Sequence, residues 1–300
     1  MNLEIIQKNY ELGYNCTPDT ITPLSGGYRN QVFLCQNKSV EDCIIKMHRE
    51  NNFFDFYTNE LSAYKLLEKT NIRKPKLLFF DKESKLLALS RIPGELLQES
   101  QTEEYYLESL DLLKDTYEKF QKIPIKKGFF IRDPENLIDG ISMLNHNLGL
   151  NLKLLSSHTD IMSKLQNSHP VYNIGSFIPN NVIRNDLDYH IDLEMFSIGN
   201  GLEDLAYFSL FSGINPINMF EHFYNESKNR TKSSFELFKA NVFKLSYLTL
   251  GLYSRELVKG VDPSKQKVLT KRIHHILNSL STFNDENIKV LKEGFNEFNM

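Results

Sequence analysis

The sequence predicts an α+β protein in two parts, a small β-rich part followed by a larger helical part. In residues 1–92, short apolar runs separated by polar turns surround one helical pattern, which is typical of a small sheet with a helix. From residue 93 onward, long amphipathic patterns dominate, and residues 172–194 are the one stretch that resembles strands. The boundary is expected at Ile92-Pro93-Gly94, so the predicted domains are residues 1–92 and 93–300.

Length and composition set the class of protein. A chain of 300 residues is long enough for two parts that each have a core, and 41% hydrophobic with 24% charged residues is ordinary globular composition. The net charge of -3 favours neither a nucleic acid nor a membrane as partner. The acidic, amphipathic start is not typical of a signal peptide, and three cysteines without metal-type spacing indicate reduced thiols. A cytoplasmic protein is therefore expected.

The β-rich part is predicted to contain a first helix near residues 3–12, followed by a β-β-α-β-β order. Its first two strands are expected at residues 31–36 and in "DCIIKMH", and the last two lie in "PKLLFFDKESKLLALSRI". The apolar spacing of "NFFDFYTNELSAYKLLEKT" predicts the helix between them. The segment "TITPLSGGYRN", with its proline and paired glycines, is expected to be a turn.

The helical part is predicted from longer patterns. "TEEYYLESLDLLKDTYEKFQKI" predicts one long amphipathic helix that stops before Pro124. "ENLIDGISMLNHNLGLNLKLL" and "HTDIMSKLQN" predict further helices, and everything after residue 194 is expected to be helical.

Three features of the β-rich part could bind phosphate. The paired glycines Gly26 and Gly27 could bring backbone N–H groups close to phosphate oxygens, although Gly-Gly is also a common hairpin turn. Lys46 ends an apolar strand and could neutralise phosphates or point to solvent. Glu60, on the next helix, could hold Lys46 as an ion pair or lie on a solvated face.

The order of these features is more informative than each one alone. A glycine turn, a strand lysine and a helix glutamate in a β-rich part are what protein kinases use to bind nucleotide phosphates. Further along, Asn181 and Asp192 supply the amide and carboxylate that hold Mg²⁺ in such enzymes. The sequence therefore predicts a phosphate-handling site.

The same segments resemble the aminoglycoside phosphotransferase and choline kinase family. "LSGGYRNQVF" is similar to its glycine loop, "ELSAYKLL" to its helix that carries the lysine partner, and "LLALSRIPGELL" to its hinge. "IDLEMFSIGNGLEDLAYF" is similar to its Ile-Asp-Phe/Trp-Glu stretch with the trailing Asp-Leu-Ala. These segments follow one another in the family's order from residue 23 to about residue 208. The resemblance implies a bilobal, protein-kinase-like fold with a small β-rich N-lobe and a larger helical C-lobe.

The resemblance also implies roles for charged residues. Lys46 would contact the α- and β-phosphates of ATP, or of another nucleoside triphosphate, and Glu60 would orient it. Asn181 and Asp192 would bind Mg²⁺, and Asp204 would support the catalytic loop.

Other implied contacts involve the nucleotide-binding backbone. Gly26, Gly27 and Asn30 would shape the phosphate loop. The backbone from Leu89 to Ile92, which includes Arg91, would meet the edge of the adenine.

The catalytic loop departs from the family pattern. The family has His-Gly-Asp-x-x-x-x-Asn, whereas this chain has "IGSFIPNN", with Ile174 at the histidine and Ser176 at the aspartate that serves as the catalytic base. A serine hydroxyl has no useful basicity at neutral pH, and a positioned general base typically contributes about 10²–10⁴-fold to the rate. Ordinary phosphoryl transfer to a small-molecule hydroxyl is therefore expected to be lost or reduced.

Several alternatives stay open. Asp186, Asp188, His190 or Glu194 could replace the missing base. The chain could be a phosphotransferase with an atypical loop, a pseudokinase that serves as a binding or regulatory module, or a kinase-fold enzyme with different chemistry such as nucleotidyl transfer. The acceptor, a small molecule or a protein, is not determined by the sequence.

Overall fold

The computed structural model describes residues 3–24, 30–49, 54–97, 102–133, 135–152, 156–225 and 231–296. Gly26 and Gly27 lie outside the described residues. The chain forms two compact units. The first unit comprises Met1–Leu96, Lys127–Phe130 and Asn181–Phe196, and the second comprises Leu97–Lys126, Ile131–Asn180 and Ser197–Met300. The predicted domains, 1–92 and 93–300, differ from these units mainly because residues 181–196 group with the first unit.

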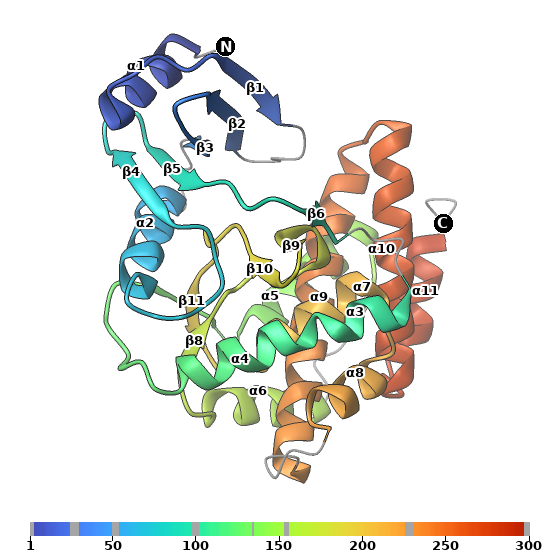
Figure 1. Cartoon of the computed structure of the whole chain (residues 1–300). Coiled ribbons are helices and arrows are strands. Elements are labelled where there is room, and N and C mark those ends of the chain that lie inside the picture. The colour runs from blue at the N-terminus through green and yellow to red at the C-terminus, as the bar shows by residue number, and fades with distance from the viewer. Residues whose placement is uncertain are drawn as a thin grey trace. The chain divides into compact units, whose positions relative to one another are not determined.

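The first unit is built on a five-stranded antiparallel sheet with the strand order β1-β2-β3-β5-β4 (Figure 1). Its elements are α1 (Leu3–Tyr14), β1 (Thr20–Leu24), β2 (Asn30–Asn37), β3 (Val40–His48), α2 (Phe56–Leu67), β4 (Leu77–Asp81) and β5 (Leu86–Ser90). Alternate residues of β3, Cys43, Ile45 and Met47, share one buried cluster with Ile6 and Tyr10 of α1. The opposite face of β3 is thereby left for Lys46.

Strand β1 occupies the segment that was expected to be a turn, so that part of the prediction is wrong. β1 pairs with β2 on one side and lies at the end of the strand order. An edge strand tolerates Pro23, because its missing N–H is not needed by a second neighbour.

A second, three-stranded sheet of the first unit joins segments that are far apart in the sequence. It has the order β10-β9-β6, with β6 at Glu95–Leu96, β9 at Val182–Arg184 and β10 at Asp188–His190. Gly94, just before β6, has a φ of +127°, and a Cβ there would collide with the carbonyl oxygen of Arg184. This close approach explains the glycine of the Ile-Pro-Gly segment.

The second unit is mostly helical. Its helices are α3 (Glu103–Glu108), α4 (Leu110–Phe120), α5 (Asn136–Leu148), α6 (Ser156–Gln166), α7 (Glu203–Ser212), α8 (Pro216–Phe223), α9 (Lys232–Val258), α10 (Pro263–Thr282) and α11 (Ile288–Asn296). Figure 1 shows the long helix α9, in orange, among them. α5 packs closely along α9, since a Cβ on Gly140 would collide with the backbone of Tyr247.

Two predictions for the helical part need correction. The single helix expected after residue 102 is broken into α3 and α4 at Ser109, whose N–H bonds to the carbonyl oxygens of Tyr106 and Leu107. Short strands also occur outside residues 172–194: β11 (Ser197–Gly199), which pairs with β8 (Val171–Asn173), and β6 and β7 (Phe130–Ile131) are examples. Among the described residues, no helix is long and apolar enough to cross a membrane.

Candidate active site

Lys46 lies in a mostly buried group of charged side chains in the first unit. Its Nζ is 2.7 Å from Oε2 of Glu60, 2.5 Å from Oδ1 of Asp192 and 3.7 Å from Oε2 of Glu194. We call Lys46, His48, Glu60, Asp192 and Glu194 the Lys46 cluster. The structure thus brings together three residues that the sequence predicted as site residues, adds His48, and includes Glu194, which the sequence offered as a replacement for the catalytic base.

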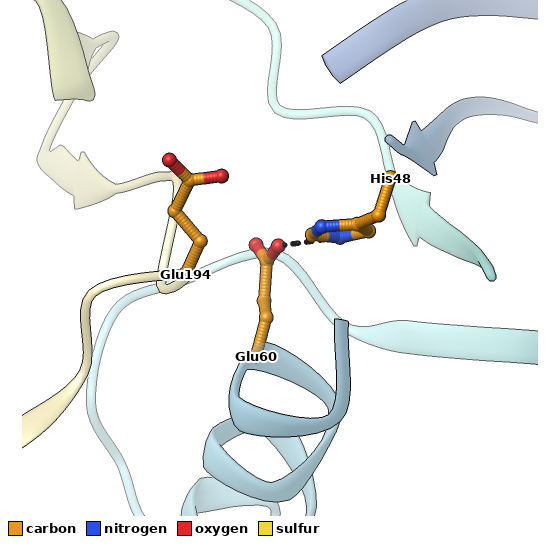
Figure 2. Close-up of side chains that lie close together, drawn as sticks. All are labelled: His48, Glu60 and Glu194. Carbon is orange, nitrogen blue, oxygen red and sulfur yellow. Dashed lines mark ion pairs between the residues drawn. The ribbon is translucent and has the colours of Figure 1, made fainter. Parts of the chain in front are cut away.

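Strand alternation explains how His48 joins the cluster. His48 follows Lys46 by two residues on β3, so both side chains leave the same face of the strand. Its Nε2 lies 2.9 Å from Oε2 of Glu60, which extends from the buried face of α2 (Figure 2). Glu60 therefore faces two basic side chains of one strand.

Burial and charge act against each other in this cluster. Burial by itself would lower the pKa of Lys46, but Asp192, Glu60 and Glu194 raise it above its ordinary value. Burial by itself would raise the pKa of Glu60, but the Lys46 ammonium and then the His48 side chain outweigh it and lower that pKa to about 2. Lys46 and Glu60 are therefore both charged at neutral pH. The pKa of Glu194 is raised, first by burial and then by Asp192.

The backbone around Asp192 holds its carboxylate in a special conformation. Asp192 has a φ of +65°, in the left-handed region that Asp tolerates better than most residues. The preceding residue, Ile191, donates its N–H to the carbonyl oxygen of Asn181 at 2.9 Å, which pairs the backbones of the two predicted metal-binding segments. The following residue, Leu193, donates its N–H to Oε1 of Glu60 at 3.2 Å.

Asn30, which was predicted to shape the phosphate loop, contacts the cluster directly. Its Nδ2 donates to Oε2 of Glu194 at 2.6 Å. Asn59 of α2 fixes the same segment, because its Nδ2 donates to the carbonyl oxygens of Glu194 and Phe196, both at 2.9 Å.

Leu89 and Arg91, predicted at the adenine edge, lie in and after β5. Leu89 is buried between Ile44 of β3 and Leu77 of β4. The guanidinium of Arg91 pairs with Asp42 at 2.6 Å, and its backbone N–H donates to the carbonyl oxygen of the same residue at 3.3 Å. A contact of this segment with adenine stays a prediction.

The segment that contains Ser176 lies in the second unit, and its backbone is firmly held. The carboxylate of Asp204 accepts the N–H of Ile174 at 2.7 Å and that of Gly175 at 2.8 Å, so this acid supports the loop as the resemblance implies. Gly175 has a φ of +84°, and its carbonyl oxygen accepts a hydrogen bond from Arg132 at 2.5 Å. Ser176 is half-buried next to these fixed residues.

Arg132 belongs to a buried ion network that sequence reasoning missed. Its Nε lies 3.4 Å from Oε1 of Glu203, whose Oε2 lies 3.1 Å from Nζ of Lys244. Burial lowers the pKa of Lys244, and it raises the pKa of Asp204, the residue after Glu203, to about 7. The signal available in the sequence was Lys244 itself, the one charged residue in the stretch "ANVFKLSYLTLGLY" of α9.

The residues considered as replacements for the missing base have different surroundings. Asp188 forms two hydrogen bonds with the guanidinium of Arg184, at 2.8 and 3.0 Å. Asp186 is exposed at the turn between β9 and β10, and His190 is fully buried. Glu194 is the one of these four residues that belongs to the Lys46 cluster.

Comparison with known proteins identifies the fold. No family model matches the chain, and no curated protein matches its sequence. Solved structures do match over almost the whole chain. The choline kinase LicA from Streptococcus pneumoniae is 14% identical with a TM-score of 0.65, and the match covers 93% of this chain and 99% of that one. The chain has the protein-kinase-like fold.

Two other kinases of this fold were solved with ligands. Amicoumacin kinase hAmiN, in complex with AMP-PNP, Ca²⁺ and Ami, is 12% identical with a TM-score of 0.68, covering 92% of this chain and 93% of that one. A thermostable mutant of the aminoglycoside phosphotransferase APH(4)-Ia, in a ternary complex with ADP and hygromycin B, is 12% identical with a TM-score of 0.63 and covers 92% and 98%. The fold predicted from the sequence is therefore confirmed.

Proposed function

We propose that this chain binds a magnesium complex of ATP, or of another nucleoside triphosphate, at the Lys46 cluster. The observation that carries the proposal is the buried Lys46 ammonium, held between the carboxylates of Glu60 and Asp192 at 2.7 and 2.5 Å. A metal–phosphate ligand carries both signs of charge. The ammonium group can face its negative phosphates, and the neighbouring carboxylate can face its positive metal ion. The nucleotide in the similar structures of hAmiN and APH(4)-Ia agrees with this proposal.

Each residue has a distinct task in this proposal. Lys46 would offset the charge of the phosphates, and Glu60, itself fixed by the N–H of Leu193, would keep the ammonium in place. Asn181 and Asp192 would hold Mg²⁺, because carboxylate and amide oxygens are the hard ligands that this ion takes. Bound magnesium would supply further neutralisation of phosphate charge. Asp192, now paired with Lys46, would exchange that contact for the metal.

We propose further that ordinary phosphoryl transfer to a hydroxyl is lost or strongly reduced. Ser176 stands at the family's base position and can neither accept a proton at neutral pH nor attract a cationic acceptor by charge. Phosphoryl transfer depends largely on positioning and charge neutralisation, so the loss of the base slows the reaction without removing the binding site. The acceptor would be a small molecule or a protein.

Thermal unfolding with and without MgATP tests nucleotide binding. A ligand that binds only the folded chain stabilises it by RT ln(1 + [L]/Kd), which is about 2.7 kcal/mol at a hundred times Kd. We expect the full chain to show an increase in Tm that disappears in Asp192→Asn, which removes one charge and keeps a residue that tolerates a positive φ. Lys265→Met is the matched control, because Lys265 pairs with Glu256 on the partly exposed surface of the second unit.

Two outcomes would overturn the proposal. The first is no increase in Tm at millimolar MgATP. The second is an increase that is the same in Asp192→Asn as in the unmodified chain, which would place the nucleotide elsewhere.

A further inference from the structure

We infer that His48, Glu60 and Glu194 form a site for a transition-metal dication that accepts an imidazole nitrogen, with Zn²⁺ as the representative ion. One ligand atom from each residue lies within 4.8 Å of the others, and all three residues are buried. Figure 2 shows Glu60 between the other two, with the His48 ring directed at its carboxylate. The site consists of other residues than Asn181 and Asp192 and requires no nucleotide, so it does not rest on the proposed function.

The buried imidazole of His48 is the feature that indicates a bound ligand. Its side chain is 1% exposed, and its Nδ1 has no hydrogen-bond partner among the described residues. Its Nε2 lies 2.9 Å from Oε2 of Glu60. Buried polar nitrogens are normally satisfied, and an imidazole among carboxylates is the usual donor for zinc and related metals.

The Lys46 cluster has an excess of negative charge that a divalent cation would balance. Glu60, Asp192 and Glu194 carry three negative charges when ionised, against the single positive charge of Lys46. A metal ligand must be an unprotonated imidazole, so His48 adds no charge when it binds. The surplus is then two negative charges in a largely buried region, which a divalent ion balances.

The carboxylates of the site are already oriented by outer hydrogen bonds. Asn30 donates to Oε2 of Glu194 at 2.6 Å, and the N–H of Leu193 donates to Oε1 of Glu60 at 3.2 Å. Such outer partners are typical of metal sites, where they fix the ligand atoms. Metal binding would take Oε2 of Glu60 away from Lys46, which keeps its contact with Asp192.

The donor set selects the class of metal. Mg²⁺ takes oxygen ligands and keeps much of its water, whereas Zn²⁺ combines imidazole with carboxylates. Three protein ligands leave a fourth position of tetrahedral zinc for water. The site should therefore bind Zn²⁺ in preference to Mg²⁺.

Calorimetric titration of ZnCl₂ into the chelator-treated full chain tests the inference. We expect one equivalent to bind with an excess of Mg²⁺ present, and affinity to fall at least tenfold in both His48→Gln and Glu194→Gln. The matched control is His158→Gln, which alters a buried histidine of the second unit and should leave zinc affinity unchanged. Thermal unfolding of each variant checks that it is folded.

Anomalous scattering at the zinc edge, from zinc-soaked crystals of the unmodified chain, is a readout that needs no variant. A peak within coordination distance of His48, Glu60 and Glu194 would support the inference. It would be overturned by a peak at other residues only, by equal affinity in His48→Gln and the unmodified chain, or by displacement of zinc by equimolar Mg²⁺.

Discussion

The Lys46 cluster of the first unit and the Ser176 segment of the second unit are each organised by a buried acid. Glu60 holds the charged side chain of Lys46, whereas Asp204 holds the backbone N–H groups of Ile174 and Gly175. The first region contains a lysine–glutamate ion pair that is almost fully buried. The second region has a fixed backbone, and Ser176 is half-buried next to it. A buried acid can therefore fix charged side chains in one part of a chain and a backbone segment in another.

Removal of the Lys46 ammonium tests how strongly the first region depends on its ion pairs. Lys46→Met should lower the free energy of unfolding by about 3–5 kcal/mol, because it leaves Glu60 buried without its ammonium partner. Chemical denaturation with urea measures this loss. Lys265→Met, which breaks a partly exposed ion pair, should cost at most about 1 kcal/mol.

A double variant distinguishes a charge effect from a packing effect. Lys46→Met combined with Glu60→Gln should be more stable than the sum of the single changes predicts, because the fully buried charge of Glu60 is removed together with its ammonium partner. Additive losses would show that the pair contributes by packing alone.

Restoration of the acid tests whether Ser176 is the missing part of the second region. Ser176→Asp should raise ATP consumption with a panel of hydroxylated acceptors by about 10²-fold, or about 2.7 kcal/mol. The gain should be at the lower end of the range for a general base, because Ile174 still stands at the histidine position. Adding Asp192→Asn should abolish the gain.

The same assay distinguishes the three functions that the sequence left open. Unmodified protein that consumes ATP, and loses this activity in Asp192→Asn, would be an enzyme and not a pseudokinase. Release of pyrophosphate with nucleotide left on an acceptor would indicate nucleotidyl transfer. Binding of nucleotide without consumption, in both the unmodified chain and Ser176→Asp, would contradict the role of Ser176 as the missing part.

A smaller, pH-dependent effect is expected from the acid that supports this segment. Burial raises the pKa of Asp204 to about 7, so the folded chain keeps a proton that the unfolded chain loses near pH 4. The free energy of unfolding should therefore fall as the pH rises from about 4 to about 7, and Asp204→Asn should lack this contribution. The asparagine has one side-chain oxygen, whereas Asp204 has two that accept from the N–H groups of Ile174 and Gly175. The loss of one acceptor should cost this variant about 1–3 kcal/mol.

Unfolding curves at several pH values measure this difference. The advantage of the unmodified chain over Asp204→Asn should be greatest near pH 4 and should shrink toward pH 7. A difference that does not change with pH would show that Asp204 has the same protonation in the folded and unfolded chains.

Much of the fold was predictable because helices and strands of five or more residues show a clear periodic pattern of apolar residues. The predictions for β2, β3, α2, β4 and β5 are confirmed, since their apolar residues alternate or recur at helical spacing. Strands of two or three residues, such as β6 and β7, are too short to show a period. The break at Ser109 is equally hidden, because serine is neither glycine nor proline and the apolar spacing continues across it.

The site was predictable where order along the chain carried the information. The sequence predicted that Lys46 pairs with Glu60, and the structure places their side chains 2.7 Å apart. His48 was missed, although the same strand alternation that faces Lys46 toward α2 also predicts its direction. The contact between Arg132 and Glu203 could not be found, because their 71-residue separation leaves no local pattern.

The positive φ of Asp192 has a consequence for how this protein can diverge. Few side chains adopt the left-handed region without strain, and asparagine, aspartate and glycine are the main ones that do. Changes to Asn or Gly would remove the charge while the backbone stays in place, whereas a β-branched residue would also disturb the hydrogen bond from Leu193 to Glu60. Relatives without a charged residue at the position of Asp192 should therefore have Asn or Gly there. The rest of the Lys46 cluster should keep its present arrangement in them.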